Sequence, residues 1–342
     1  MRFIIVLIIG LFFIKLTLSK ELLYSDEYII DFLSENITKK KEEIINEIKY
    51  DSFKNIIISL VTNDEYTKLN KIIDINFINR FVYGIDIYEE KINNNTYFSK
   101  TKIAYDNTKI FDFFISNNLD FIAYEPEPYL IVIFDQRIFS EKILSPENKY
   151  YKFLTNNKLK YEYFSIPNLD INDRFIVQKE DFFYKKISNY DKLFNKYQNV
   201  NILLVHSILK NNEFNIYSYI YEDNYFYSLD SFFYKKIDYE KFFDDLQSKT
   251  LDYWKNKNIV NSSKLNQLEC KVKTLNLVEL KTIKKIINNN KVIKQIKANE
   301  ISYNSSMYHL LYYGNLNILI KSLNKDKIHL EITDNLCEIK II

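Results

Sequence analysis

Glycine is the residue whose scarcity says most about this chain, because only three of its 342 residues are glycine. Gly10 lies in an apolar stretch at the N-terminus, which leaves Gly84 and Gly314 for the rest of the chain. Dinucleotide-binding fingerprints, P-loops and nucleophile elbows all need glycine for tight turns or for close approach of the backbone to a ligand. None of these motifs can be built from the glycines present, so nucleotide chemistry of those types is excluded.

Histidine is equally rare, and its three positions do not indicate a metal site. His206, His309 and His329 each stand alone in a predicted strand, and none is spaced from another as a pair of ligands. No cysteine or carboxylate completes a zinc set around them. The sequence therefore predicts no metal and no cofactor, and it shows no catalytic motif. A triad that takes its nucleophile from a distant part of the chain stays open.

Cysteine is present only twice, as Cys270 and Cys337. Both fall in the last predicted unit, on its first and final strands. They can form a disulfide if those two strands are neighbours in one sheet and the compartment is oxidising. Two separate buried thiols are the interpretation that the sequence slightly favours, and the disulfide is the alternative.

The first nineteen residues have the layout of a secretory signal peptide. Arg2 is followed by an apolar run over Phe3–Ile14, and Thr17-Leu18-Ser19 places small residues at the positions that precede a cleavage site. The run is shorter than the ~20 apolar residues that a membrane-spanning helix needs. We therefore expect cleavage near Ser19, with no stable membrane insertion afterwards, and a periplasmic or otherwise secreted protein.

Charge and composition describe a globular chain with an almost neutral balance. Hydrophobic residues make up 47% and aromatic residues 16% of the chain, enough to build real cores. There are 47 basic and 45 acidic residues, and the two extra basic residues, Arg2 and Lys15, lie in the predicted signal peptide. A neutral chain without a long basic run does not predict a nucleic-acid partner or an anionic membrane surface.

Hydrophobic periodicity predicts three α+β units after the signal peptide of residues 1–19, at 20–125, 126–260 and 264–342. The last unit shows the order βαββαβ followed by one more strand, and the first shows the same order if Leu119–Tyr124 is its closing strand. Such units close a four-stranded ferredoxin-like sheet with helices on one face. We therefore expect ferredoxin-like units at both ends, flanking a mixed α/β middle domain that begins with the buried strand Tyr129–Phe134.

Several features follow one another in an order that is known from one family. Residues Ile56–Asn63 are read as the apolar end of a helix followed by a turn, and Thr101–Asp106 as a strand that leads into a helix. Pro128 then precedes the apolar strand Tyr129–Phe134. A Pro and two Asp then precede an Arg within Ser165–Arg174. This order resembles the bacterial exported family named domain of unknown function 2066, over most of the chain beyond residue 19. Where that family often has Gly, this chain has Asn63, which can also adopt a left-handed turn. The resemblance implies an envelope protein of α+β architecture and implies no activity.

Asp170, Asp173 and Arg174 form the sharpest polar cluster in the sequence. In one interpretation they line a groove, where two carboxylates and a guanidinium hold a peptide end, a cation or a sugar hydroxyl. In the other, which the sequence favours, Asp170 caps a turn, and Asp173 or Arg174 pairs internally to fix a loop.

These observations predict a non-enzymatic exported protein that binds an envelope protein or peptide, for example by strand addition at a sheet edge. The alternative is an envelope hydrolase or glycan-binding protein that uses a groove around Asp170, Asp173 and Arg174. The two differ in whether those three side chains converge on an open pocket or are used in internal hydrogen bonds.

Overall fold

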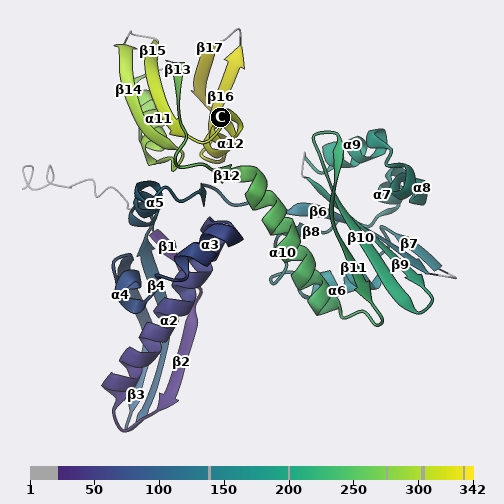
Figure 1. The fold of residues 1–342 in the computed structure, drawn as a ribbon, viewed down its shortest axis with the longest axis horizontal. Coiled ribbons are helices and arrows are strands. Elements are labelled where there is room, and N and C mark those ends of the chain that lie inside the picture. The colour runs from purple at the N-terminus through teal and green to yellow at the C-terminus, as the bar shows by residue number, and fades with distance from the viewer. Residues whose placement is uncertain (1–21, 138–139, 199–200, 275, 302–304, 334–335) are drawn as a thin grey trace, which may run out of the picture. The chain divides into compact units, whose positions relative to one another are not determined.

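The computed structural model describes residues 22–342 except 138–139, 199–200, 275, 302–304 and 334–335 (Figure 1). The predicted signal peptide, residues 1–19, lies outside the described residues. The protein is α+β, with 39% helix and 37% strand, and its described part contains eleven helices and four sheets. The chain divides into two compact units, the first made of residues 1–121 and 260–342 and the second of residues 122–259. The middle domain predicted at 126–260 differs from the second unit by at most four residues at either bound, whereas the two terminal units predicted separately fall into one.

The N-terminal part of the first unit contains an antiparallel sheet centred on β4. Strand β4 pairs with both β1 and β2 along one side and with β3 along the other. The strands are β1 (Leu22–Tyr24), β2 (Tyr28–Leu33), β3 (Val82–Asn93) and β4 (Thr96–Asp106).

Four helices accompany this sheet, and each begins at a side chain that caps it. The helices are α2 (Ile37–Leu60), α3 (Asn63–Leu69), α4 (Ile75–Asn79) and α5 (Asn107–Ser116). Asp106 caps α5, because its carboxylate accepts the backbone N–H of Lys109 at 3.2 Å. Helix α2 is continuous, and within it the Ser52 hydroxyl donates to the Ile48 carbonyl at 2.6 Å. Phe53 and Phe81 stack with ring centroids 5.4 Å apart and start an aromatic core between helices and sheet.

The N-terminal part is not the predicted ferredoxin-like unit. Only Phe121–Ile122 of the expected closing strand is extended, as β5, and it pairs with β12 (Ile259–Val260) instead of joining the sheet around β4. These two short strands are where the chain passes from one unit to the other and back. Both residues of β5 are buried. Local periodicity shows that a segment is apolar and extended, but it does not identify the strand with which the segment pairs.

The C-terminal part of the first unit has its elements in the predicted order. They are β13 (Leu265–Lys273), α11 (Leu277–Asn289), β14 (Ile293–Ile301), β15 (Ser305–Tyr313), α12 (Leu316–Lys325), β16 (Ile328–Thr333) and β17 (Leu336–Ile341). The sheet has five strands in the order β14-β15-β13-β17-β16, so the predicted four-stranded closure is wrong. Strand β17 pairs antiparallel with β16 and lies parallel to β13. The buried side chains of Cys337 and Ile339 favour this inner position for β17 over the sheet edge.

The neighbouring strands β13 and β17 settle the state of the two cysteines. Cys270 and Cys337 are directly opposite in the pairing of these strands and form a disulfide. The interpretation of two separate thiols is therefore wrong. It required that the strands carrying the two cysteines not be neighbours in the sheet, whereas β13 and β17 are paired.

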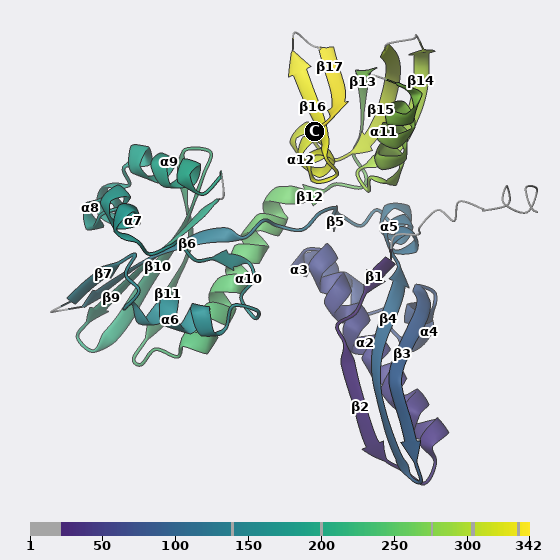
Figure 2. The same ribbon diagram turned by 180° about the vertical axis from the view of Figure 1, so that it is seen from behind.

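The second unit is a mixed sheet with helices on both faces (Figure 2). Its strand order is β11-β10-β9-β6-β7, with β8 also paired to β6, and the central strands β6 and β9 are parallel. The strands are β6 (Tyr129–Arg137), β7 (Ser140–Ile143), β8 (Phe164–Ser165), β9 (Ile202–Lys210), β10 (Glu213–Glu222) and β11 (Tyr225–Tyr234). Each residue of the predicted buried strand Tyr129–Phe134 is at most 2% exposed.

Two sets of helices cover the two faces of this sheet. Helices α6 (Lys149–Asn156) and α10 (Tyr239–Asn258) lie on one face, where Tyr150 and Phe242 make an edge-to-face ring contact. On the other face lie α7 (Ile171–Ile176), α8 (Lys179–Tyr184) and α9 (Ile187–Lys196), and Phe182 of α8 packs on Phe134. Residues 170–197, which include the predicted Asp170 cluster, thus form one helical layer on the sheet of the second unit.

Candidate functional site

Asp170 is the N-cap of helix α7. Its carboxylate accepts the backbone N–H of Asp173 at 2.8 Å, which satisfies one of the amide groups that a helix start leaves without an internal partner. The hydrogen bond from that amide, aided by the charge of Lys196, lowers the pKa of the Asp170 carboxyl below its usual value. Asp170 therefore has the capping role that the loop-organising interpretation gives it.

Asp173 points inward from α7 and is 0% exposed. Its two carboxylate oxygens accept from the Lys196 ammonium at 2.5 Å and from the Tyr197 hydroxyl at 2.6 Å. The Tyr197 oxygen in turn accepts the backbone N–H of Asn168 at 2.7 Å. The hydrogen bond to Asp173 raises the pKa of Lys196, and burial followed by the same carboxylate raises the pKa of the Tyr197 phenol. This network fastens the start of α7 to the end of α9.

Arg174 points away from this network and is exposed. Its Nε lies 3.5 Å from the carbonyl oxygen of Asp170, and no carboxylate within the described ranges pairs with its guanidinium. Asp173 has no exposed surface with which to contact a ligand. The three side chains consequently do not converge on an open groove.

Helix α7 instead presents apolar side chains to solvent on the side opposite Asp173. Ile171 is 61% and Phe175 72% exposed, and residues four apart are neighbours on a helix surface. Figures 1 and 2 show α8 beside α7, and the exposed large apolar residues continue there and into α9. We name this surface the α7–α8 patch, and it consists of Ile171, Phe175, Phe183, Tyr184 and Ile187.

Cations and carboxylates both lie near the patch, and one of the cations, Lys179, is already paired with Glu141 at 3.2 Å. Arg174, Lys179 and Lys186 are exposed, whereas the carboxylates of Asp173 and Asp181 are buried in hydrogen bonds within the layer. The sequence analysis did not find this patch, because apolar residues at helical spacing usually face a core. The Asp170–Asp173 pair in the sequence could have indicated it. With Asp170 as the helix cap and Asp173 facing inward, the apolar residues of α7 are left to face solvent.

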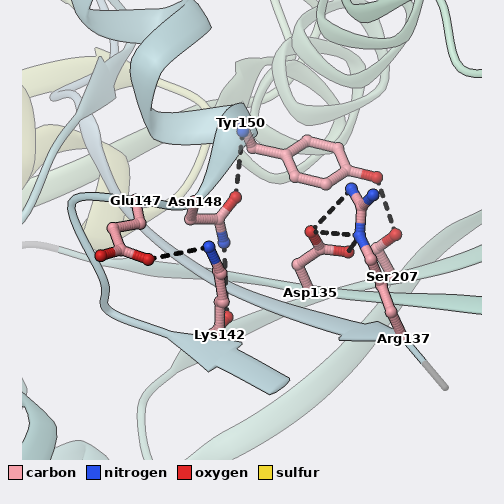
Figure 3. Close-up of polar contacts among 7 residues, drawn as sticks. All are labelled: Asp135, Arg137, Lys142, Glu147, Asn148, Tyr150 and Ser207. Atoms are coloured by element: carbon pink, nitrogen blue, oxygen red, sulfur yellow. Dashed lines mark hydrogen bonds and ion pairs between the residues drawn. The ribbon is translucent and has the colours of Figure 1, made fainter. Parts of the chain in front are cut away.

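A second polar cluster lies at the carboxyl ends of the parallel strands β6 and β9 (Figure 3). Asp135 is 3% exposed. Its carboxylate accepts a hydrogen bond from Arg137 Nε at 3.0 Å and forms an ion pair with a terminal guanidinium nitrogen of Arg137 at 3.0 Å. The hydroxyls of Tyr150 and Ser207 lie 2.7 Å apart, and both side chains are fully buried. Asn148 caps α6 by accepting the backbone N–H of Tyr150 at 3.0 Å, which aims Tyr150 at the sheet.

Nucleophilic catalysis by Ser207 would need a base beside its hydroxyl. The only hydrogen-bond partner of that hydroxyl in the described part of the chain is Tyr150, whose pKa is raised by burial, so its phenolate is costly to form. His206 is adjacent in sequence and therefore faces the opposite side of the sheet, where it stacks on Phe134 and bonds to Gln136 at 3.0 Å. Burial lowers the pKa of His206 to about 4, which keeps the ring neutral. This geometry favours a packing role for the cluster, which ties α6 to β6 and β9.

The remaining predictions about sites concern metals and membranes. Across the described ranges, no three His, Cys, Asp or Glu side chains come together in a way that could hold a metal ion. Among the same residues, no helix combines the length and the apolar character that crossing a bilayer requires.

Comparison with known proteins gives no relative from which the roles of these residues could be inferred. No family model, no curated protein sequence and no solved structure matches this chain.

Proposed function

We propose that this chain is a non-enzymatic protein of the periplasm, or otherwise secreted, that binds an envelope protein or peptide through the α7–α8 patch. The observation that carries the proposal is the exposure of its five side chains, which ranges from 43% to 75%. Single exposed apolar residues are common, but five large ones on three successive helices of one layer favour an interaction surface. The Asp173–Lys196 contact joins α7 to α9, and the Asn189 amide donates to Asp181 of α8, so the surface is ordered before a partner binds.

The chemistry of the partner follows from the residues of the patch and their neighbours. The aromatic rings of Phe175, Phe183 and Tyr184 suit apolar anchors, because aromatic side chains bury large areas at little entropic cost. The exposed cations Arg174 and Lys186 favour a partner that carries acidic residues around those anchors. We therefore expect a partner segment with alternating apolar and acidic faces.

Two observations support a location outside the cytoplasm. The first is the signal-peptide pattern of residues 1–19, and the second is the Cys270–Cys337 disulfide, a bond that persists in oxidising compartments. Membership of the exported family of domain of unknown function 2066 stays a prediction, and it agrees with such a location.

Site-specific photo-crosslinking in intact cells tests the proposal. A photoreactive benzoyl-phenylalanine at position 175 should capture a distinct partner, whereas the same group at position 159 should not, because Leu159 is 95% exposed but lies outside the patch. The identified partner should then bind the Ile171→Ser/Phe175→Ser protein about tenfold or more weakly than the unaltered chain. The melting temperature should not change, since both side chains are exposed.

The control is Leu159→Ser, which also removes an exposed apolar side chain and should bind the partner normally. Raising the salt concentration should weaken binding of an acidic partner. Equal crosslinking from both positions, crosslinks to a second copy of this chain alone, or normal binding by the double variant would each refute the proposal.

A further inference from the structure

A pocket of about 300 Å³ opens in the N-terminal part of the first unit, far in sequence from the α7–α8 patch. It lies between the residues that join α4 to β3 and one side of α5. Its walls carry the charged side chains of Arg80, Lys109 and Asp112 and the rings of Phe81 and Phe113. This volume is at the lower end of the range for small-molecule sites.

Two cations stand on one side of this pocket. The guanidinium of Arg80 lies 5.4 Å from the ring centre of Phe77 and 5.7 Å from that of Phe81, which holds it against the aromatic surface. The Lys109 ammonium donates to the backbone carbonyl of Arg80 at 3.2 Å, and an ammonium has two further N–H groups to offer. The pocket thus presents several donors suited to a carboxylate.

Asp112 supplies the opposite charge from the next turn of α5. Within the described residues, neither the Arg80 guanidinium nor the Asp112 carboxylate forms an ion pair, although both line the same pocket. Other charged side chains of this region do pair, such as Lys41 with Glu90 at 2.7 Å and Lys100 with Glu89 at 2.8 Å. The charges of the pocket are therefore available to groups of a ligand.

The floor of the pocket is aromatic and rigid. Phe81 and Phe113 meet edge to face with ring centroids 5.7 Å apart. Both rings also contact Phe77, at 5.1 Å and 5.2 Å, and so belong to the packed core between α2, α4 and α5. An apolar group of a ligand can rest on this floor without reordering the core.

We propose that this pocket binds a zwitterionic α-amino acid that has a large apolar side chain. The carboxylate of the ligand faces Arg80 and Lys109, its ammonium faces Asp112, and its side chain lies on Phe81 and Phe113. A ligand with one positive and one negative group complements both unpaired charges, whereas a simple anion would be repelled by Asp112. For about a dozen non-hydrogen atoms, we expect a dissociation constant on the order of 1 mM.

Saturation-transfer NMR on the purified chain tests this site, because it detects weak binding to a large protein. L-Phenylalanine should give a saturable signal, and N-acetyl-phenylalanine and phenethylamine, which lack one charge each, should bind about tenfold more weakly or worse. Arg80→Gln and Asp112→Asn should each weaken phenylalanine binding by a similar factor. Asp112→Asn keeps the shape of the side chain and leaves the Arg80 contacts with Phe77 and Phe81 intact, so it tests the site even if Arg80→Gln lowers stability.

The control is Lys158→Gln, which removes an exposed cation in the second unit, outside the α7–α8 patch, and should leave phenylalanine binding unchanged. Absence of saturable binding up to about 10 mM, ten times the expected constant, would overturn the proposal. Equal binding of the two singly charged analogues, or unchanged binding by both pocket variants, would overturn it as well. None of these outcomes bears on the α7–α8 patch, so the two proposals fail separately.

Discussion

Cys270 and Cys337 are opposite each other in the parallel pairing of β13 and β17, with their Cα atoms 4.4 Å apart and their sulfurs joined. The bond links the first strand of the C-terminal sheet to the last and closes a loop of 67 residues. In the unfolded chain it therefore limits the conformations of nearly all the residues that form this sheet.

Removing this disulfide should lower stability strongly. For a loop of 67 residues, the chain-entropy relation gives about 4 kcal/mol for the Cys270→Ser/Cys337→Ser variant. Denaturant unfolding with and without a reducing agent measures the difference. Reduction should shift the midpoint of the unaltered protein to that of the variant and leave the variant itself unaffected. A midpoint that is insensitive to reduction would mean that the two thiols are not joined in solution.

Breaking the buried Asp173–Lys196 pair should destabilise the second unit. Asp173→Asn keeps the shape of the side chain but leaves the Lys196 ammonium without the carboxylate that it meets at 2.5 Å. Loss of one partner of a buried pair costs about 3–5 kcal/mol, and the partial exposure of Lys196 places our expectation at the lower end. Chemical denaturation measures this loss, and Arg174→Ala is the control that should change stability by less than about 0.5 kcal/mol. Equal destabilisation by both substitutions would contradict the roles assigned here.

The hydroxyl pair of Tyr150 and Ser207 provides a test of coupling between α6 and β9. Tyr150→Phe removes one hydroxyl and leaves the other buried without its partner, which should cost about 1–3 kcal/mol. Ser207→Ala should cost a similar amount. The double variant should lose less than the sum of the single losses, because no hydroxyl of the pair is then orphaned. Strictly additive losses in a double-mutant cycle would show that the two groups do not interact.

His206 should make the free energy of unfolding depend on pH between about pH 4 and 6.5. Burial lowers its pKa from 6.5 to about 4 in the folded protein, so the unfolded chain binds the proton more readily in this interval. Its contribution is complete above pH 6.5 and is lost progressively as the pH falls toward 4, by about 3 kcal/mol in total. His206→Gln should reduce the slope of unfolding free energy against pH in this window. His309→Gln is the control, since His309 is partly exposed, and an unchanged slope in His206→Gln would refute the assignment.

The sequence by itself determined the local structure of this protein. Apolar periodicity located the doubly buried strand β6 and the elements of the C-terminal part, because side-chain spacing reports which faces of an element are buried. Asp170 could be identified as a cap because a helix start needs a nearby side-chain acceptor. The scarcity of glycine predicts that nucleotide-binding motifs built on glycine turns are absent.

Only the tertiary structure decided which of these segments meet. The pairing of β5 with β12, the position of β17 beside β13 and the disulfide that follows from it all depend on contacts between residues far apart in sequence. The same holds for Asp173, whose partner Lys196 is brought close by the packing of α7 on α9. Once that contact turns Asp173 inward, Ile171 and Phe175 must face solvent, since they lie on the other side of the same short helix. Periodicity cannot show this, because it identifies an apolar face but not what covers that face.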